Sequence, residues 1–204
     1  QGQAMRRCRP CSHNNLPMFS LRYFQVMEYH NKKMEVFIMG TRGLWGFRKD
    51  GVDKLTYNHY DSYPDYLGRT VVEFVKNHAK EKLDNIFKRI VLVDEDTPAT
   101  AEAMVLCKKY CDTGVSTQQI TDWYCLLRGA QGCPEAYADG LRFMIDDAEF
   151  IKNSLFCEYA YIINLDDNVL EYWVGFQKKP VQNNSFKTES LTFRFRKNIL
   201  IFMD

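Results

Sequence analysis

The sequence has no excess of charge of either sign. Its 204 residues contain 27 Lys and Arg against 26 Asp and Glu, which gives a formal net charge of +1. A protein that binds nucleic acid or an acidic membrane surface through its overall charge needs a clear basic excess. The balance therefore argues against both kinds of partner for the chain as a whole.

Long apolar runs and a regular cysteine pattern are also missing. No stretch reaches the roughly 18 apolar residues that a membrane span needs, and no apolar segment of signal-peptide form follows the basic N-terminus. The 7 cysteines are odd in number and irregularly spaced, which fits a reducing compartment better than a disulfide scaffold. We expect a soluble, intracellular, cytoplasmic protein with no membrane partner.

The motifs of several common chemistries do not occur either. The chain has no glycine-rich dinucleotide motif after a strand, no P-loop, no His-Glu-x-x-His and no Gly-x-Ser-x-Gly. These absences argue against nucleotide-dependent, zincin and α/β-hydrolase chemistry. We therefore predict no cofactor.

What the sequence does have is enough apolar material for a core, together with an uneven distribution of charge. Hydrophobic residues make up 46% of the chain and aromatic residues 14%. Residues 1–38 hold six basic and two acidic residues, a net of +4, so the remainder carries −3. We predict a basic arm over residues 1–38, poorly ordered or accessory, and a single domain over residues 39–204. Nucleic acid is therefore a candidate partner only through the basic arm.

The dipeptide Asp50-Gly51 is the strongest local signal in the chain. It lies between two β-prone runs, and a type I′ turn needs the positive φ angles that Asp and Gly tolerate at its two central positions. Counting outward from this turn places Arg48 opposite Asp53, an opposite-charge pair that supports the register. The same count places Arg42 opposite His59.

Several helices are expected after this hairpin. Apolar spacing over residues 69–90 is consistent with one long helix or two short ones. Thr97-Pro98 predicts the start of the next helix, with Thr as N-cap and Pro in the first turn. Ser116 and Gln119 form the pattern of a capping box, and Asp146 and Glu149 repeat the pattern before a short helix expected through Phe150 and Ile151.

A second hairpin and a last strand complete the expected fold. Residues 158–165 and 169–176 are rich in aromatic and β-branched residues and flank the turn Asp166-Asp167-Asn168. Residues 178–190 are polar and are expected to form a mobile loop before a last strand. We predict the α+β class, with an antiparallel sheet built from the two hairpins and a helical segment between them packed on one face.

The first candidate site is a polar face of the leading hairpin. The counted register brings Arg42, Tyr57 and His59 together, and Asp61 follows two residues later. A cation, a phenol and an imidazole could bind an anionic group or move a proton, with Asp61 orienting the imidazole ring. The structural alternative is that His59 and Asp61 satisfy backbone groups at a turn while Arg42 stacks on Tyr57.

The second candidate is Cys125. On a helix it shares a flank with Arg128, which could stabilise a thiolate, and His59 could act as the base if the hairpin packs nearby. The alternative is that Cys125 is a small buried hydrophobic residue, which is the usual role of a free cysteine.

Metal binding has only weak signals. Cys8 and Cys11 form half of a zinc site that His13 and His30 could complete, but the spacing of the histidines is unusual and a flexible tail explains the segment equally. The doubled acidic residues, among them Asp146-Asp147, lie where caps and turns are needed. We predict no metal.

The segment MGTRGLWGFRKDGVDKLTYNHYDSYPDYLG resembles a group of uncharacterised small proteins of bacteria, phages and some eukaryotes that open with Met-Gly-Thr-Arg-Gly. The resemblance continues through STQQITDWYCLLRGAQG and FMIDDAEFIKNSLFCEYAYIINLDDNVLEYWVGFQ, so it covers most of residues 39–178. It implies a shared domain that starts at Met39. It implies no particular activity.

The sequence supports two functions. The first is a binding or interaction module that uses the hairpin face around Arg42, Tyr57, His59 and Asp61, with Arg128 as a further ligand-binding residue and a protein or a small anionic ligand as partner. The second is a small hydrolase or transferase with His59 and Asp61 as an acid-base pair and Cys125 as nucleophile. The location of the largest pocket distinguishes them.

Overall fold

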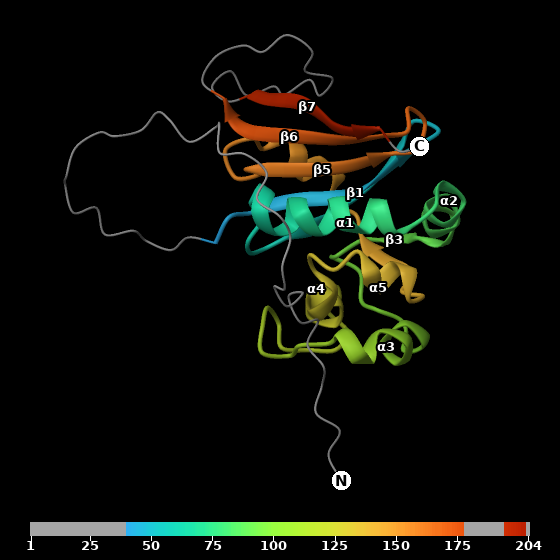
Figure 1. Cartoon of the computed structure of the whole chain (residues 1–204). Coiled ribbons are helices and arrows are strands. Elements are labelled where there is room, and N and C mark those ends of the chain that lie inside the picture. Colours follow the sequence, from blue (N-terminus) through green and yellow to red (C-terminus); the bar gives the residue numbers. More distant parts are fainter. Residues whose placement is uncertain (1–39, 178–193, 203–204) are drawn as a thin grey trace, which may run out of the picture. The chain divides into compact units, whose positions relative to one another are not determined.

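The computed structural model describes the backbone of residues 40–177 and 194–202, and the side chains of residues 40–175. The predicted arm, residues 1–38, and the predicted loop, residues 178–190, lie outside the described residues. The chain forms one mixed sheet, a second small sheet and several short helices (Figure 1). The α+β class is confirmed.

The strands are β1 (Gly43–Lys49), β2 (Val52–Asn58), β3 (Val91–Val93), β4 (Phe143–Ile145), β5 (Tyr159–Asn164), β6 (Val169–Gln177) and β7 (Arg194–Phe202). The α-helices are α1 (Arg69–Asn77), α2 (Lys80–Arg89), α3 (Ala101–Cys107), α4 (Trp123–Leu127) and α5 (Glu135–Ala138). A π-helical turn, η1 (Pro64–Gly68), precedes α1, and 3-10 turns form η2 (Lys108–Tyr110), η3 (Arg128–Ala130) and η4 (Ala148–Lys152).

The first hairpin has the predicted register. Lys49 pairs with Val52 and Arg48 with Asp53, while Asp50 and Gly51 both have positive φ, 53° and 71°. Local chemistry decides this hairpin, because few residue pairs other than Asp-Gly fit both central positions of the turn. The second hairpin, β5 and β6, is antiparallel as expected, and β7 pairs with β6 as the last strand.

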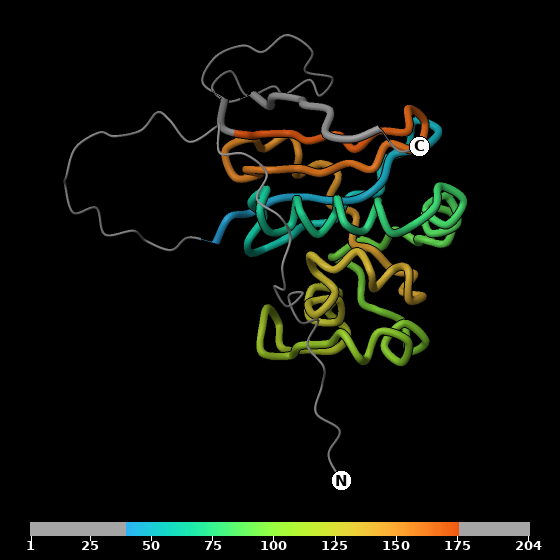
Figure 2. The backbone as a smooth tube through the Cα atoms, viewed as in Figure 1, coloured from blue at the N-terminus to red at the C-terminus, as the bar shows by residue number. Residues whose placement is uncertain are grey.

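The two hairpins meet through a parallel pair, which corrects the predicted antiparallel sheet. The strand order is β2-β1-β5-β6-β7, and β1 runs parallel to β5 with Trp45 opposite Tyr161. A parallel neighbour requires a long crossover connection, and the helices between the two hairpins form it. The strands of the second sheet, β3 and β4, lie within this crossover and are also parallel to each other. Figure 2 follows the chain from blue through the green and yellow crossover to the orange strands of the second hairpin.

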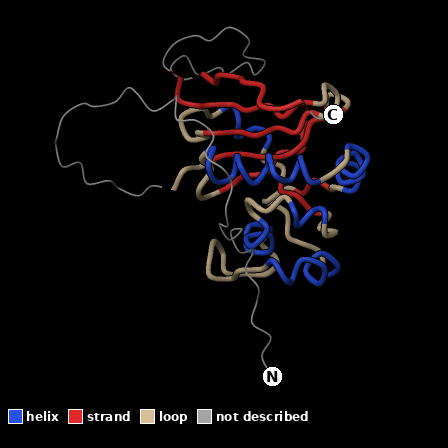
Figure 3. The backbone as a smooth tube through the Cα atoms, viewed as in Figure 1, coloured by secondary structure: helices blue, strands red, loops and turns tan. Residues whose placement is uncertain are grey.

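Both faces of strand β1 are buried. Because side chains alternate along a strand, Trp45 and Phe47 pack on one face with Phe74 of α1, and Leu44 packs on the other with Ile151 of η4. The helical segment between the hairpins therefore does not cover one face alone: α1 lies on one face and η4 on the other (Figure 3).

Two predicted helix starts are wrong. Thr100, not Thr97, caps α3, because its side chain accepts a hydrogen bond from the backbone N–H of Ala103 at 3.2 Å. The N-cap of α4 is Asp122, whose carboxylate accepts from the N–H of Tyr124 at 2.7 Å; Ser116 instead donates its hydroxyl to Asp122. In each case a second capping residue farther along the chain takes the position. The segment 69–90 forms two helices, one of the two predicted alternatives.

Candidate functional site

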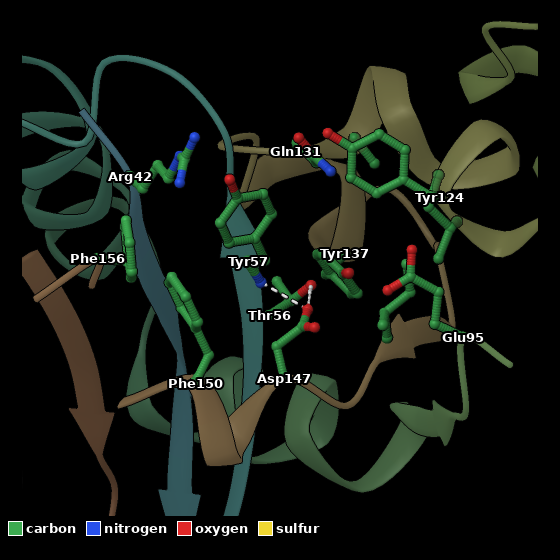
Figure 4. A pocket seen from close by; sticks show the side chains of 13 residues that line it. Arg42, Thr56, Tyr57, Glu95, Tyr124, Gln131, Tyr137, Asp147, Phe150 and Phe156 are labelled. Atoms are coloured by element: carbon green, nitrogen blue, oxygen red, sulfur yellow. Dashed lines mark hydrogen bonds between the residues drawn. The ribbon is translucent and has the colours of Figure 1, made fainter. Parts of the chain in front are cut away.

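A cavity of about 340 Å³ lies between the first hairpin, the small sheet and helices α4 and α5. Figure 4 shows its polar side chains pointing inward from several segments of the chain. A volume of this size suits a small molecule. Its lining consists of Arg42, Thr56, Tyr57, Glu95, Tyr124, Leu127, Ala130, Gln131, Tyr137, Ile145, Asp147, Phe150 and Phe156.

Arg42 supplies the positive charge of the cavity wall. It lies just before β1, and its guanidinium group stands 5.7 Å from the ring centroid of Phe156. Arg128, at the start of η3, lies beside the cavity over the rings of Tyr60 and Tyr124 and donates a hydrogen bond to Gln131. Within the described part of the chain, neither guanidinium group forms an ion pair with a carboxylate.

His59 and Tyr57 lie close enough to Arg42 and Arg128 for both positive charges to act on them. The hydroxyl of Tyr57 lies 2.9 Å from Nδ1 of His59, at hydrogen-bond distance. Burial lowers the pKa of His59, and the positive charges of Arg128 and Arg42 lower it further. Burial raises the pKa of Tyr57, against the effect of the same two arginines. The imidazole is therefore neutral at neutral pH, and the cluster's charge comes from the arginines.

Asp61 does not take the place predicted for it. Asp61 is exposed and has a positive φ of 53°. Its backbone carbonyl accepts a hydrogen bond from the N–H of Leu67 at 3.2 Å. The structure records no hydrogen bond between Asp61 and His59, both of which are described. The hydroxyl of Tyr57 orients the imidazole ring, and Asp61 serves the turn that leads to α1.

Cys125 is buried in α4 and does not line the cavity. It is 0% exposed, and its Sγ donates a hydrogen bond to the carbonyl of Val115 at 2.9 Å. Arg128 extends toward Tyr60 and Tyr124, which explains why its charge acts on His59. The described residues thus bring Arg42, Tyr57, His59 and Arg128 together, while Cys125 has the surroundings of a structural cysteine.

The burial of Cys125 leads to a prediction about its reactivity. We expect iodoacetamide to alkylate Cys125 in the folded protein at least about a hundredfold more slowly than in the denatured protein, because reaction requires local opening. Mass spectrometry of peptides at successive times measures the rate, with free cysteine in the same solution as the reference. Rapid, stoichiometric labelling of Cys125 in the native protein would restore it as a candidate nucleophile.

Asp147 is the principal site residue that the sequence reasoning missed. Its Oδ2 accepts a hydrogen bond from the backbone N–H of Tyr57 at 2.8 Å and lies 3.4 Å from Oγ1 of Thr56, which also donates to it. Burial raises the pKa of Asp147 to about 6, and the negative charge of Glu95 contributes, although the hydrogen bond from Tyr57 acts in the opposite direction. A carboxyl group with this pKa changes protonation state near neutral pH.

The signal for Asp147 was present in the pair Asp146-Asp147. Only Asp146 has the capping role expected of both, since its carboxylate accepts from the N–H of Ala148 at 3.2 Å. Asp147 points into the cavity instead (Figure 4). A pair of adjacent acidic residues where one cap suffices is a signal that one of them has another role.

Glu95 and Tyr137 complete the acidic side of the cavity. Glu95 is an exposed residue, but desolvation of its carboxyl group at the cavity wall raises its pKa, and the nearby carboxylates Asp122 and Asp96 raise it further. Tyr137 is only 2% exposed, yet its hydroxyl has no hydrogen-bond partner among the described residues. The cavity therefore has a guanidinium group on one wall and two carboxyl groups with raised pKa values on another.

Comparison with known proteins supplies no assignment. No family model, curated protein or solved structure matches the chain.

The described residues also bear on metals and membranes. Among them, no group of three or more His, Cys, Asp and Glu side chains could hold a metal ion, and the thiols of Cys107, Cys111, Cys125 and Cys157 are free. The half-site at Cys8 and Cys11, with His13 and His30, lies outside the described residues. None of the helices in the described segments is long and apolar enough to cross a membrane.

Proposed function

We propose that this domain binds a small anionic molecule in the cavity, with Arg42 and Tyr57 as direct ligands and Arg128 as a second positive charge beside them. The observation that carries the proposal is that Arg42 lines a cavity of about 340 Å³ without an ion-pair partner among the described residues. A half-buried guanidinium group without a counter-ion is costly to maintain, and a bound anion would compensate it.

The surroundings of Arg42 support an anion rather than a neutral ligand. Arg128 adds a second positive charge, which is also without a carboxylate partner among the described residues. Tyr57 also lines the cavity. Its hydroxyl can donate its proton to an anion when Nδ1 of His59 is protonated and donates to the hydroxyl oxygen. Planar guanidinium groups bind carboxylates and phosphates through paired hydrogen bonds.

A concave site favours a small molecule over a protein partner. Protein interfaces are typically broad and bury roughly 800 Å² on each side, whereas a cavity of this size encloses a molecule of a few to about 20 non-hydrogen atoms. The hydrolase alternative has less support, because Asp61, His59 and Cys125 do not form a hydrogen-bonded group among the described residues.

A binding titration of the full chain tests the proposal. We expect inorganic phosphate or acetate to bind with a Kd of about 1 to 10 mM at low ionic strength and to shift the NMR signals of Arg42, Tyr57 and His59. Arg42→Gln should weaken the binding at least about tenfold, because it removes the charge that lines the cavity.

Arg142→Gln is the matched control, since Arg142 is exposed and lies 3.7 Å from Glu102. It should leave the affinity unchanged. Thermal unfolding of each variant checks that the fold is intact. If neither anion shifts these signals, or if both arginine variants lose affinity equally, the cavity is not an anion site.

A further inference from the structure

The acidic side of the cavity arises from the small parallel sheet. Glu95 follows β3 and Asp147 follows β4, and these strands pair in parallel with Val93 opposite Ile145. The carboxyl ends of parallel strands lie at the same edge of a sheet, so residues from segments about fifty positions apart meet there. Figure 4 shows both carboxyl groups directed into the cavity.

Some polar atoms on this acidic side have no hydrogen-bond partner among the described residues. The oxygen Oδ2 of Asp147 accepts from Tyr57 and Thr56, but Oδ1 has no hydrogen-bond donor among the described residues. The carboxylate of Glu95 belongs to an exposed residue at the cavity wall, whereas Tyr137 is buried and its hydroxyl has no hydrogen-bond partner in the described segments. A nearly fully buried tyrosine that lines a cavity and whose hydroxyl has no partner in the described segments points to a ligand group at this position.

The two charged sides of the cavity do not neutralise each other. Arg42 and Asp147 both line it, yet the described residues contain no ion pair between Arg42 and either Asp147 or Glu95. Opposite charges in a partly desolvated cavity attract strongly if they can meet. Because the protein holds them apart, a ligand with a charge at each end would satisfy both.

Resting on the proposed function, we infer that the ligand is bipolar. Its anionic group binds Arg42 and Tyr57, and an ammonium group binds the carboxyl groups of Asp147 and Glu95. The hydroxyl of Tyr137 adds a hydrogen bond at the same end. The class of ligand is thus a small amine that also carries a phosphate or a carboxylate, and the rings of Tyr57 and Phe150, which contact each other edge to face, line the cavity beside it.

Matched pairs of probes separate the two ends of the ligand. Phosphoethanolamine is compared with ethyl phosphate, and γ-aminobutyrate with butyrate, so that each pair differs in the amine alone. In calorimetric titrations of the full chain near pH 7.5, we expect the amine to tighten binding about tenfold in at least one pair. Asp147→Asn should remove this advantage and leave the affinity for the amine-free anion unchanged.

The neighbouring exposed residue supplies the control. Asp146→Asn changes the net charge equally but should preserve the advantage of the amine, since Asp146 caps η4 and does not line the cavity.

Each outcome of these titrations has a distinct meaning. If no probe binds, the proposed function fails. If the anions bind but the amine brings no gain in either pair, the anion site stands and the bipolar ligand is wrong. If the gain persists in Asp147→Asn, the assignment of the ammonium group to Asp147 is wrong.

Discussion

Replacing Arg48 with methionine should destabilise the fold by about 3 to 5 kcal/mol, the largest stability effect that we expect from any substitution considered. The reason is Glu171, which lies in the middle of strand β6 and is 0% exposed. An Nη1 of Arg48 lies 3.3 Å from Oε2 of Glu171, so the substitution removes a nearby positive charge from a fully buried carboxylate.

The carboxylate of Glu171 is also a centre of hydrogen bonding. It accepts from Nδ2 of Asn164 at 2.8 Å and from Nε1 of Trp173 at 3.0 Å. These bonds remain in the Arg48→Met variant and hold the carboxylate in place, so it cannot move to water. Arg48 also forms two hydrogen bonds to Asp53, at 2.6 and 2.9 Å, and the substitution removes both.

Chemical denaturation monitored by tryptophan fluorescence measures the loss, and a fall in melting temperature of about 10 °C should accompany it. Lys152→Met is the control, because its ion pair with Glu149 is exposed and is worth less than about 1 kcal/mol. The double variant Arg48→Met with Glu171→Leu should recover part of the loss. A single variant that loses less than about 1 kcal/mol would show that Glu171 does not depend on Arg48.

The first hairpin and the candidate site differ in how far the sequence could predict them. Arg48, Asp53 and the turn between them lie within six consecutive residues, so turn chemistry and charge pairing suffice to set the register. Counting along the same hairpin also located Arg42, Tyr57 and His59 on one face. This part of the site required no information from distant residues.

The acidic side of the site depends on long-range pairing instead. Glu95 and Asp147 meet only because two three-residue strands pair across the intervening helices. Strands of that length carry almost no periodic signal, and the partners in the β1–β5 parallel pair are even farther apart in sequence. Sequence reasoning treats each segment separately, so it assigned Asp147 to a cap and built the sheet from antiparallel hairpins alone.

Helix caps failed for a related reason. Residues 95–122 contain many Ser, Thr and Asp side chains that can accept a hydrogen bond from a free backbone N–H. Which of them does so depends on where the helix packs. Thr100 and Asp122 take the two positions because the apolar faces of α3 and α4 must reach the core through Ala103 and Trp123. A threonine caps α3 as expected, although at a different position, whereas an aspartate takes the place of the predicted Ser116–Gln119 capping box at α4.

The second large effect concerns the pH dependence of stability at Asp147. Burial raises its pKa from 3.8 to about 6 in the folded protein, so folding favours the protonated form. Below pH 4 the carboxyl group is protonated in both states and costs nothing. As the pH rises from about 4 to about 6, the unfolded chain loses the proton before the folded protein does, and the free energy of unfolding of the wild-type protein falls. Above about pH 6 both states are ionised and the cost is constant at about 3 kcal/mol.

Asp147→Asn should remove this cost. Asn keeps an oxygen that can accept from the N–H of Tyr57, but it carries no charge. We therefore expect the free energy of unfolding of the variant, relative to wild type, to rise by about 3 kcal/mol between pH 4 and pH 7, as measured by urea denaturation at each pH. Asp146→Asn corrects for the change in net charge. A difference that is constant with pH would show that Asp147 is not desolvated, whereas the expected rise means that the fold maintains a destabilising charge in the cavity, as binding sites commonly do.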